Sequence, residues 1–337
     1  TFTAAFDFEI VNELKKAKKI AAYYGTDHHE LYIKGGELSS IIEQLIHHHD
    51  EPFSDAANIP LYLLTKEVKR THKVILQGDG GDELFGGYRR YATLSNLSYL
   101  YPLNWLVNKL LSHFNNNKIA RFKRFSSAIS NSNDAIRMAL LLTVETTYNS
   151  PLSVLSTEVK NALVDTNPFI VYEQINKLIS KLDPVQKMLW TDIQILLPET
   201  FLEKVDKSTM ANGVEVRVPF LDNELSQFAL SLPSNLKVKN GTKKFLLKQA
   251  LKKTVPKEIL NAPKSGFGVP YSNWLKEPLK DYLIETLNSS TIKNIFNKKI
   301  LDLKINEHLT NRNNNGFLLW KLLNLCIWIN KYKIDIL

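Results

Sequence analysis

The sequence predicts an α/β fold, in which a parallel sheet with covering helices is followed by a large helical portion. Short apolar runs that suit strands alternate with segments of helical periodicity over the first 92 residues, an order typical of parallel sheets. After residue 92 the apolar residues recur at helical spacing and strand-like runs become rare. These observations place a boundary near residue 92 and divide the chain into an α/β unit, 1–92, and a mainly helical unit, 93–337.

Each element of the first unit has a local signal. Gly25 follows a periodic segment and is a natural helix stop, Pro60 suits the first turn of a helix, and Val74–Leu76 indicates a short buried strand. The expected elements, in order, are a strand over 2–6, a helix over 12–24, a strand over 29–34, helices over 37–47 and 59–70, and a strand over 73–77.

The second unit is expected to be built from helices. Its most apolar stretch, 317–329, has about 13 residues and is interrupted by Lys321 and Asn324. A membrane span needs about 20 apolar residues, so this stretch predicts a buried helix. The expected helices cover 99–114, 134–143, 168–181, 183–196, 224–230, 243–254, 275–287 and 316–329.

Composition excludes several classes of protein. The 337 residues include 43 basic and 34 acidic side chains, a net charge of +9, and the basic excess lies after residue 95. The aromatic residues do not interleave with basic ones as a base-stacking surface requires, which favours a solvated basic face over nucleic-acid binding. The one cysteine, Cys326, excludes an internal disulfide and a multi-thiolate zinc site. We expect a cytoplasmic protein.

The densest chemical signal follows the strand expected over 73–77. The segment 74–88 runs from apolar residues into glycines interleaved with Asp79, Asp82 and Glu83. Glycines let backbone N–H groups approach a ligand, and carboxylates beside phosphates suit Mg²⁺. The carboxyl end of a parallel strand is where open α/β sheets bind ligands. Capping of a helix would explain Asp82 alone, so we interpret the segment as functional.

A second segment, 197–222, carries charged residues among apolar ones. Lys204 and Lys207 precede Glu215 and Arg217, which flank Val216 in an extended stretch and so point to one face. We expect these charges to be partly buried and therefore partnered. Spacing alone leaves two interpretations of Glu215 and Arg217 equally open, namely a structural ion pair and a substrate site.

Weaker signals lie in two loops. Lys264 follows Pro263 in a glycine-bearing loop, where a mobile positive charge suits phosphate, although an isolated loop lysine is usually a surface residue. The acidic loop 50–55 precedes a helix, and a cap with a proline-shaped turn explains it adequately. The consecutive histidines at 47–49 point in different directions on a helix, which disfavours a shared metal.

Taken together and in order, these segments resemble the synthetase domain of glutamine-hydrolysing asparagine synthetase. The wider family includes β-lactam synthetase and amidotransferases of polysaccharide gene clusters. Residues 77–91 resemble the family pattern SGEGADELFGGYRRY, 204–222 resemble KVDRMSMAHSLEARVPFLD, and 264–267 resemble KxGF. Residues 27–30 and 50–55 resemble THHE and DEPFAD. The resemblance covers almost the whole chain.

The resemblance implies a PP-loop ATPase fold, that is, a Rossmann-like fold of the adenine-nucleotide-hydrolase type, with 1–92 as part of the nucleotide-binding unit. It implies ATP-dependent adenylation of aspartate, followed by amidation with ammonia from glutamine, with ATP and Mg²⁺ as cofactors. The implied site residues are Asp79 and Lys264 for catalysis, Ala4, Glu13, Gln77 and Gly78 for ATP, Lys207, Glu215 and Arg217 for substrate or phosphate, and Asp82 and Glu83 for Mg²⁺.

The sequence differs from the family pattern at several positions, and each difference leads to a prediction. The pyrophosphate loop SGGxDS is absent, so we expect a chain truncated before its first strand and inactive alone. An N-terminal glutaminase domain is expected as a partner, because Cys326 lies in an apolar helix and cannot replace its catalytic cysteine. Gln77 and Asp79 stand where the family usually has Ser and Glu. The form GDGGDELFGGY is similar to members from surface-polysaccharide clusters, so a carboxylate acceptor other than aspartate stays open. An RNA-modifying ATPase and a non-catalytic fragment stay open as alternative functions, and a homodimer stays open as the oligomeric state.

Overall fold

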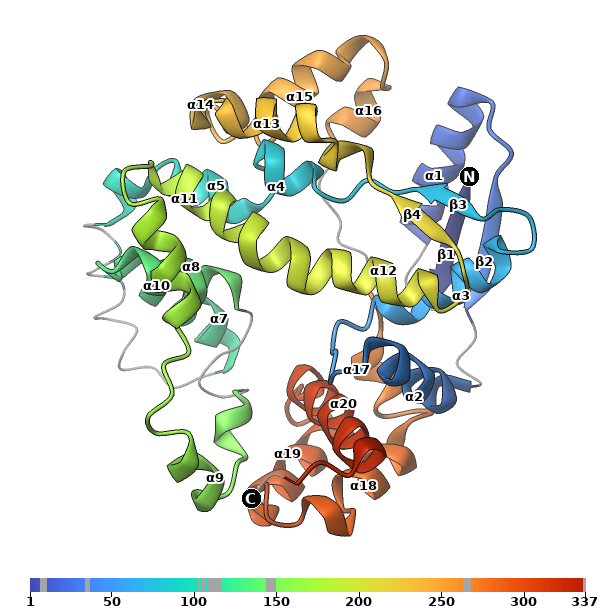
Figure 1. Ribbon diagram of the computed structural model, residues 1–337, viewed down its shortest axis with the longest axis vertical. Helices are drawn as coiled ribbons and strands as arrows, with labels where there is room; N and C mark the ends of the chain where they lie inside the picture. The colour runs from blue at the N-terminus through green and yellow to red at the C-terminus, as the bar shows by residue number, and fades with distance from the viewer. Residues whose placement is uncertain are drawn as a thin grey trace.

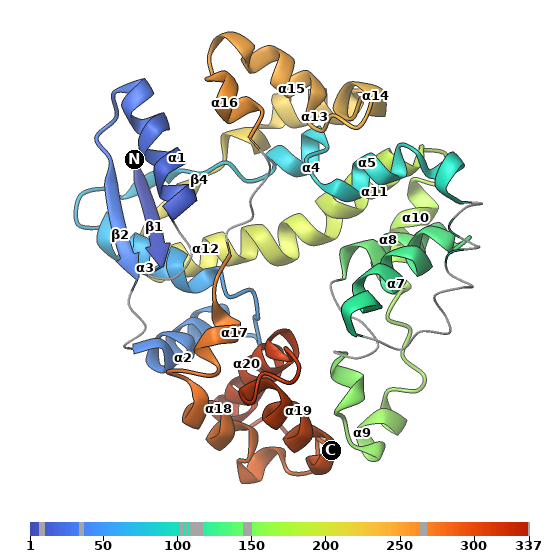
Figure 2. The ribbon, with the colours of Figure 1, turned by 180° about the vertical axis from the view of Figure 1, so that it is seen from behind.

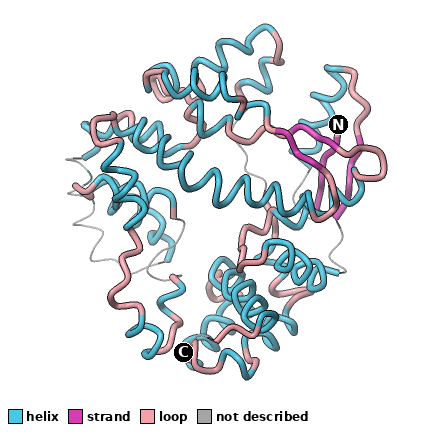
Figure 3. The backbone as a smooth tube through the Cα atoms, viewed as in Figure 1, coloured by secondary structure: helices cyan, strands magenta, loops and turns pink. Residues whose placement is uncertain are grey.

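The computed structural model describes residues 1–6, 11–33, 37–101, 104, 107, 117–143, 150–262 and 268–335. One long helical run crosses the molecule from a group of helices at one end to the strands at the other (Figure 1). The view from behind shows the C-terminal helices gathered on one side of this run and the segment α13–α16 on the other (Figure 2). Helices dominate and the strands lie together near the N-terminus (Figure 3).

The described strands form two parallel pairs. β1 (Phe2–Phe6) pairs with β2 (His29–Ile33), with Phe2 opposite His29. β3 (Val74–Leu76) pairs with β4 (Glu215–Arg217), with Val74 opposite Glu215. The expected strands over 2–6, 29–34 and 73–77 are confirmed within a residue or two at each end. The second pair draws one strand from each side of residue 92.

The prediction that Val74–Leu76 is a buried strand is wrong. The side chains of Val74 and Leu76 are 40% and 71% exposed. In the described chain β3 has a strand neighbour on one edge only, β4. A strand of a parallel sheet is buried when neighbouring strands and helices cover it, and β3 lacks that cover here.

The first helices follow the expected order. α1 (Val11–Tyr24), α2 (Leu38–His49) and α3 (Asn58–Val68) fall where the periodicity places them. α3 packs against β1 and β2 on one side and against α12 on the other. The other helices are α4 (Gly81–Phe85), α5 (Arg89–Leu94), α7 (Asn117–Ser130), α8 (Asp134–Leu142), α9 (Thr157–Ala162), α10 (Ile170–Leu178), α11 (Pro184–Thr191), α12 (Glu203–Met210), α13 (Asn223–Ser231), α14 (Ser234–Lys237), α15 (Phe245–Ala250), α16 (Lys257–Leu260), α17 (Tyr271–Trp274), α18 (Lys280–Leu287), α19 (Lys298–Leu309) and α20 (Gly316–Tyr332).

The crossing helix is longer than the expected helix over 183–196. It starts at α11, where Asp183 caps the backbone N–H groups of Val185 and Gln186. It then continues through a π-helical segment, η3 (Asp192–Leu202), into α12. Pro198 lies inside η3 and cannot donate a helical hydrogen bond. The helix accommodates this proline as a π-helical segment and continues into α12. The expected helix over 99–114 lies mostly outside the described residues.

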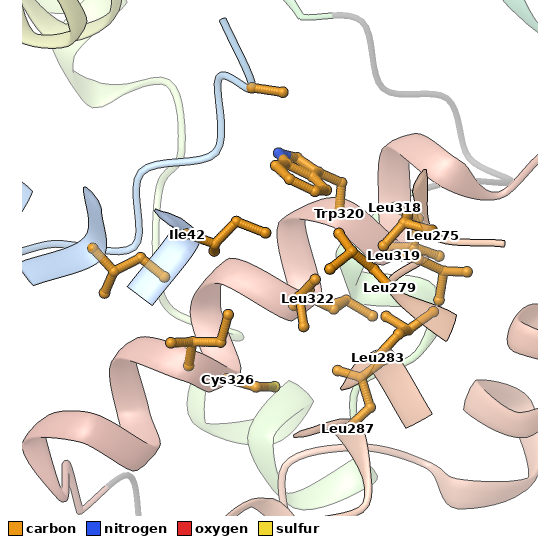
Figure 4. Packing of buried hydrophobic residues seen from close by; sticks show 14 of the residues in the cluster. Ile42, Leu275, Leu279, Leu283, Leu287, Leu318, Leu319, Trp320, Leu322 and Cys326 are labelled. Atoms are coloured by element: carbon orange, nitrogen blue, oxygen red, sulfur yellow. The ribbon is translucent and has the colours of Figure 1, made fainter. Parts of the chain in front are cut away.

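The largest core surrounds α20, as the apolar run predicts. Leu319 and Leu322 lie beside leucine side chains of α18 and of the segment before it, and Cys326 is fully buried in the same cluster (Figure 4). Burial raises the pKa of the Cys326 thiol to about 12, so the thiol stays protonated and serves as packing. Within the described ranges, none of the helices combines the length and apolar character that a membrane crossing requires.

Candidate functional site

The glycine-bearing loop begins directly after β3 and leads into α4. Gly80 has a positive φ of 83°, and a Cβ placed on it would lie 2.3 Å from Leu221 Cδ2. A Cβ on Gly81 would lie 3.3 Å from the ring of Phe220. These glycines therefore let residues 220 and 221 pack on the loop, which is a structural role that sequence analysis missed. A Cβ on Gly78 would meet nothing within 4 Å, so here the backbone stays open to a ligand as expected.

The two kinds of glycine should respond differently to substitution. Gly80→Ala should lower the free energy of unfolding by about 2 kcal/mol, because both its φ and Leu221 oppose a side chain. Gly78→Ala is the matched control and should change it by less than about 0.5 kcal/mol. Urea unfolding of the two variants measures the difference, and equal losses would contradict the packing role of Gly80.

Asp79 combines partial burial with an unsatisfied oxygen. Its Oδ2 atom is buried and has no hydrogen-bond partner among the described residues. Burial raises the pKa of the Asp79 carboxyl, Lys204 opposes this, and the negative charges of Glu83 and Asp82 add to it. A carboxylate in this state is suited to take up a proton from a reacting group. The structure thus gives Asp79 a chemical character that fits its expected catalytic role.

Lys204 joins the glycine loop to the acidic loop 50–55. Its Nζ lies 2.9 Å from Asp55 Oδ2, and its side chain is 12% exposed. Asp55 also caps the turn before α3, since its Oδ1 accepts a hydrogen bond from the Ala57 backbone. Asp55 therefore performs the structural role and also pairs with Lys204, whose charge opposes the raised pKa of Asp79. Lys204 was expected to be partnered, but its place beside Asp79 could not be read from its spacing.

His49 is a second group that sequence analysis missed. It is 3% exposed, and its ring stacks on Phe53 with centroids 4.1 Å apart. Its Nδ1 lies 3.6 Å from Glu203 Oε1. Burial lowers the pKa of His49 to about 4, and the positive charge of Lys207 contributes. Lys207, which is an expected phosphate ligand, lies one helical turn after Glu203 on α12. Its charge helps to keep His49 neutral.

This histidine predicts a pH effect on stability. The pKa of His49 is about 4 in the folded chain and about 6.5 in an unfolded one. The unfolded state binds the proton more tightly, so the contribution of His49 to stability falls as pH decreases from 6.5 to 4. His49→Gln should therefore gain stability relative to the parent across that range, measured by urea unfolding at several pH values. Equal stability of His49→Gln relative to the parent at every pH in this range would contradict the prediction.

Glu215 and Arg217 form the ion pair that was one of the two open interpretations. Arg217 Nε donates to Glu215 Oε1 over 2.8 Å. The expectation that these charges are partly buried is wrong, because the side chains are 55% and 66% exposed on β4. The backbone of Arg217 also accepts the N–H of Gln77 at 3.0 Å. The pair therefore sits on the strand beside the start of the glycine loop, and its role toward a substrate stays a prediction.

The expected magnesium carboxylates both have protein partners. Asp82 Oδ1 lies 3.0 Å from Lys244 Nζ. Glu83 is 2% exposed and accepts a hydrogen bond from the Tyr88 hydroxyl. Within the described residues no three His, Cys, Asp or Glu side chains gather as a metal site. The buried and bonded Glu83 does not fit direct coordination, and Asp82 would have to give up Lys244.

A buried ion pair holds the end of the glycine loop against the crossing helix. Arg90 Nη2 lies 2.7 Å and Nε 3.2 Å from the two carboxylate oxygens of Asp192, the first residue of η3. Tyr91 donates its hydroxyl to the same carboxylate. Burial raises the pKa of Asp192 to about 6, against the effect of Arg90, so the pair is ionised at neutral pH. The pair fixes the helix that carries Lys204.

A cavity of about 650 Å³ lies beside the acidic loop that contains Asp55. The loop 51–57, the end of η3, the segment before α17 and the first turns of α20 line it. Asp55 belongs to its wall, and its ion pair with Lys204 links the cavity to the lysine whose charge acts on Asp79. A volume of this size lies within the range of small-molecule sites, about 300–1,000 Å³.

Three expected site residues are not brought to the glycine loop by the described part of the chain. Ala4 is buried in the middle of β1, opposite Leu31, in the other strand pair. Glu13 lies on α1, but its side chain is outside the described residues, and so is all of Lys264. The structure therefore brings together Gln77, Gly78 and Asp79 with Lys204, and the contribution of the three residues stays a prediction.

Comparison with known proteins gives one consistent result. A family model described as "Asparagine synthase" matches residues 1–330. The chain is 30% identical to "Asparagine synthetase [glutamine-hydrolyzing] 1" of Bacillus subtilis, over 97% of this chain and 51% of that protein. It is 28% identical to a "Putative asparagine synthetase [glutamine-hydrolyzing]" of Mycobacterium bovis, over 97% and 50%. A Penicillium rubens protein named "Amidase chyE" is 25% identical over 87% and 47%. The chain spans about half the length of these relatives.

Proposed function

The chain belongs to the asparagine synthase family, and from this premise we propose that it is the synthetase part of an ATP-dependent amide ligase. The enzyme converts the side-chain carboxylate of aspartate to an amide, using ammonia released from glutamine. The observation that carries the proposal is Asp79, whose buried and unpartnered Oδ2 lies at the end of a parallel strand next to the open backbone of Gly78.

The reaction has two steps. An oxygen of the carboxylate attacks the α-phosphorus of ATP, and pyrophosphate leaves with the electrons of the broken P–O bond. Ammonia then attacks the carbonyl carbon of the acyl-adenylate, the C–O bond breaks, and AMP leaves. Asp79 takes the proton that the attacking nitrogen loses, since burial raises the pKa of its carboxyl and so makes it a better base.

The other expected site residues neutralise the charge of the phosphates or position the nucleotide and the substrate. Lys264 neutralises the phosphate charge that builds during attack on the α-phosphorus. Lys207 and Arg217 attract the phosphates or the substrate carboxylate, and Glu215 orients Arg217 through the ion pair at 2.8 Å. Gln77 and Gly78 contact the nucleotide through backbone groups, and Ala4 and Glu13 complete the ATP site from β1 and α1. No step is assigned to Mg²⁺, because the described carboxylates do not fit its coordination.

The two strand pairs support a larger sheet. In the described chain β1 and β3 each have one strand neighbour, β2 and β4. A parallel strand inserted between β1 and β3 would join the two pairs into one sheet and pair with the free backbone edge of β3. We propose that the complete enzyme supplies this strand, the pyrophosphate loop that follows it and a glutaminase domain.

Aspartate-dependent exchange between ATP and labelled pyrophosphate tests the proposal, because only the adenylation step is reversible in this way. The complete enzyme should catalyse the exchange with aspartate and without glutamine or ammonia. Exchange with a uronic acid in place of aspartate would favour the amidotransferases of polysaccharide synthesis. Absence of exchange with every carboxylate, together with tight RNA binding at moderate salt, would contradict the proposal and favour an RNA-modifying ATPase.

A further inference from the structure

The cavity beside Asp55 has one apolar wall and one acidic rim. Phe317 and Trp320 of α20 and Tyr271 of α17 line the apolar wall. Glu51, from the loop before α3, and Glu199, from η3, form its acidic rim, and Lys321 of α20 also lines the cavity. Such a division suits a small molecule that carries both an apolar body and charged groups.

The indole of Trp320 offers an unused hydrogen-bond donor at this wall. Trp320 is 3% exposed, and its Nε1 has no hydrogen-bond partner among the described residues. Figure 4 shows this nitrogen on the side of the ring that faces away from the leucine side chains of the core. Buried indole N–H groups normally find an acceptor, and leaving one unpaired is unfavourable. An acceptor atom delivered by a ligand would remove this cost.

Tyr271 adds a second donor to the same wall. Its ring lies 5.5 Å from that of Trp320, measured between centroids. Burial raises the pKa of the Tyr271 hydroxyl, and the negative charge of Asp55 contributes. The hydroxyl therefore stays protonated at neutral pH and can donate to an oxygen of a bound molecule.

Three carboxylates, Glu51, Asp55 and Glu199, line the cavity, and two of them have no ion-pair partner among the described residues. Asp55 is neutralised by Lys204 at 2.9 Å, but among the described residues neither Glu51 nor Glu199 has an ion-pair partner. The pKa of Glu203 is raised by burial, lowered by Lys207, and raised further by the charges of Glu51 and Glu199. Glu51 and Glu199 therefore each lie close enough to Glu203 to repel its carboxylate, and a cation placed near these carboxylates would be stabilised.

We propose that this cavity is the acceptor site and that it recognises a zwitterion, an amino acid with a free ammonium group. The Trp320 indole donates a hydrogen bond to an oxygen of the acceptor, and Glu51 and Glu199 hold the ammonium group. This inference rests on the proposed function for the identity of the acceptor. Glu51 and Glu199 are then the residues that select an acceptor with an ammonium group, and Trp320 is a residue that positions this acceptor in the cavity.

The indole N–H signals of this chain test the proposal without any turnover. The chain has five tryptophans, and in a nitrogen-labelled sample Trp320→Phe identifies the Trp320 signal by its loss. Titration with L-aspartate at millimolar concentrations should shift this signal in a saturable way. Succinate has the same carboxylates without the ammonium group and should bind at least roughly tenfold more weakly, because it cannot pair with the acidic rim. An unmoved Trp320 signal, or equal shifts with succinate, would overturn the proposal.

Kinetics of the complete enzyme separate this inference from the proposed function. Glu199→Gln and Trp320→Phe should each raise the KM for aspartate by roughly tenfold, with the KM for ATP unchanged. Glu158→Gln, on the exposed surface of α9, is the control and should change neither constant. Aspartate that shifts the Trp320 signal in an enzyme without ATP–pyrophosphate exchange would contradict the proposed reaction but not the binding site. Unchanged KM values in both variants would contradict the binding site alone.

Discussion

Lys264→Ala is expected to reduce aspartate-dependent ATP–pyrophosphate exchange by at least about 10²-fold in the complete enzyme, the loss typical of removing one preorganised charge-stabilising group. Attack on the α-phosphorus concentrates negative charge on the phosphate oxygens. A lysine in a glycine-bearing loop can approach those oxygens as a mobile positive charge. The loss should appear in the exchange rate, with little change in the free energy of unfolding.

The matched control for this variant is Lys257→Ala, at the exposed start of α16. It removes the same charge from the same half of the chain and should retain normal exchange. If Lys264→Ala also exchanges at a near-normal rate, Lys264 is a surface residue and its assignment to the phosphate site is wrong.

Asp192→Asn is expected to lower the free energy of unfolding by about 3–5 kcal/mol, because it leaves Arg90 buried with an uncompensated charge. Asp192 is completely buried, and both of its oxygens bind the Arg90 guanidinium. The same guanidinium lies 4.1 Å from the centre of the Tyr88 ring. Urea unfolding of the chain measures the loss.

Two comparisons identify the buried charge as the cause. The double variant Arg90→Met with Asp192→Asn should recover most of the stability, since it removes both charges and keeps an oxygen that accepts from the buried Tyr91 hydroxyl. Asp302→Asn breaks the exposed pair with Lys298 on α19 and should cost less than about 0.5 kcal/mol. A double variant as unstable as Asp192→Asn would show that packing around Asp192 matters more than its charge.

Local signals were sufficient for most of the fold. The periodicity and stop signals around Gly25 and Pro60 place α1 and α3, and the apolar run before Cys326 places α20. The exposure of the side chains on β3 could not be predicted from such local signals. Val74 and Leu76 have the residue types of a buried strand, but burial depends on which other segments lie beside a strand, and this is not encoded in the strand itself.

The candidate site was predicted in part. Gln77, Gly78 and Asp79 could be singled out because carboxylates and glycines follow an apolar strand. Lys204 could be recognised as a charge among apolar residues, but its position between Asp55 and Asp79 depends on helix packing across about 150 residues of sequence. Trp320 gave no signal at all, because a tryptophan in an apolar helix is indistinguishable from a core residue until the surroundings of its nitrogen are known.

The most direct test of the account follows the oxygen atoms of the acceptor. Aspartate labelled with a heavy oxygen isotope in its side-chain carboxylate should be converted by the complete enzyme, with ATP and ammonia, to asparagine. If the carboxylate is adenylated, one labelled oxygen leaves with the nucleotide, and mass spectrometry should find AMP that carries one label. Unlabelled AMP, or label recovered in orthophosphate, would contradict an acyl-adenylate and with it the function proposed for this chain.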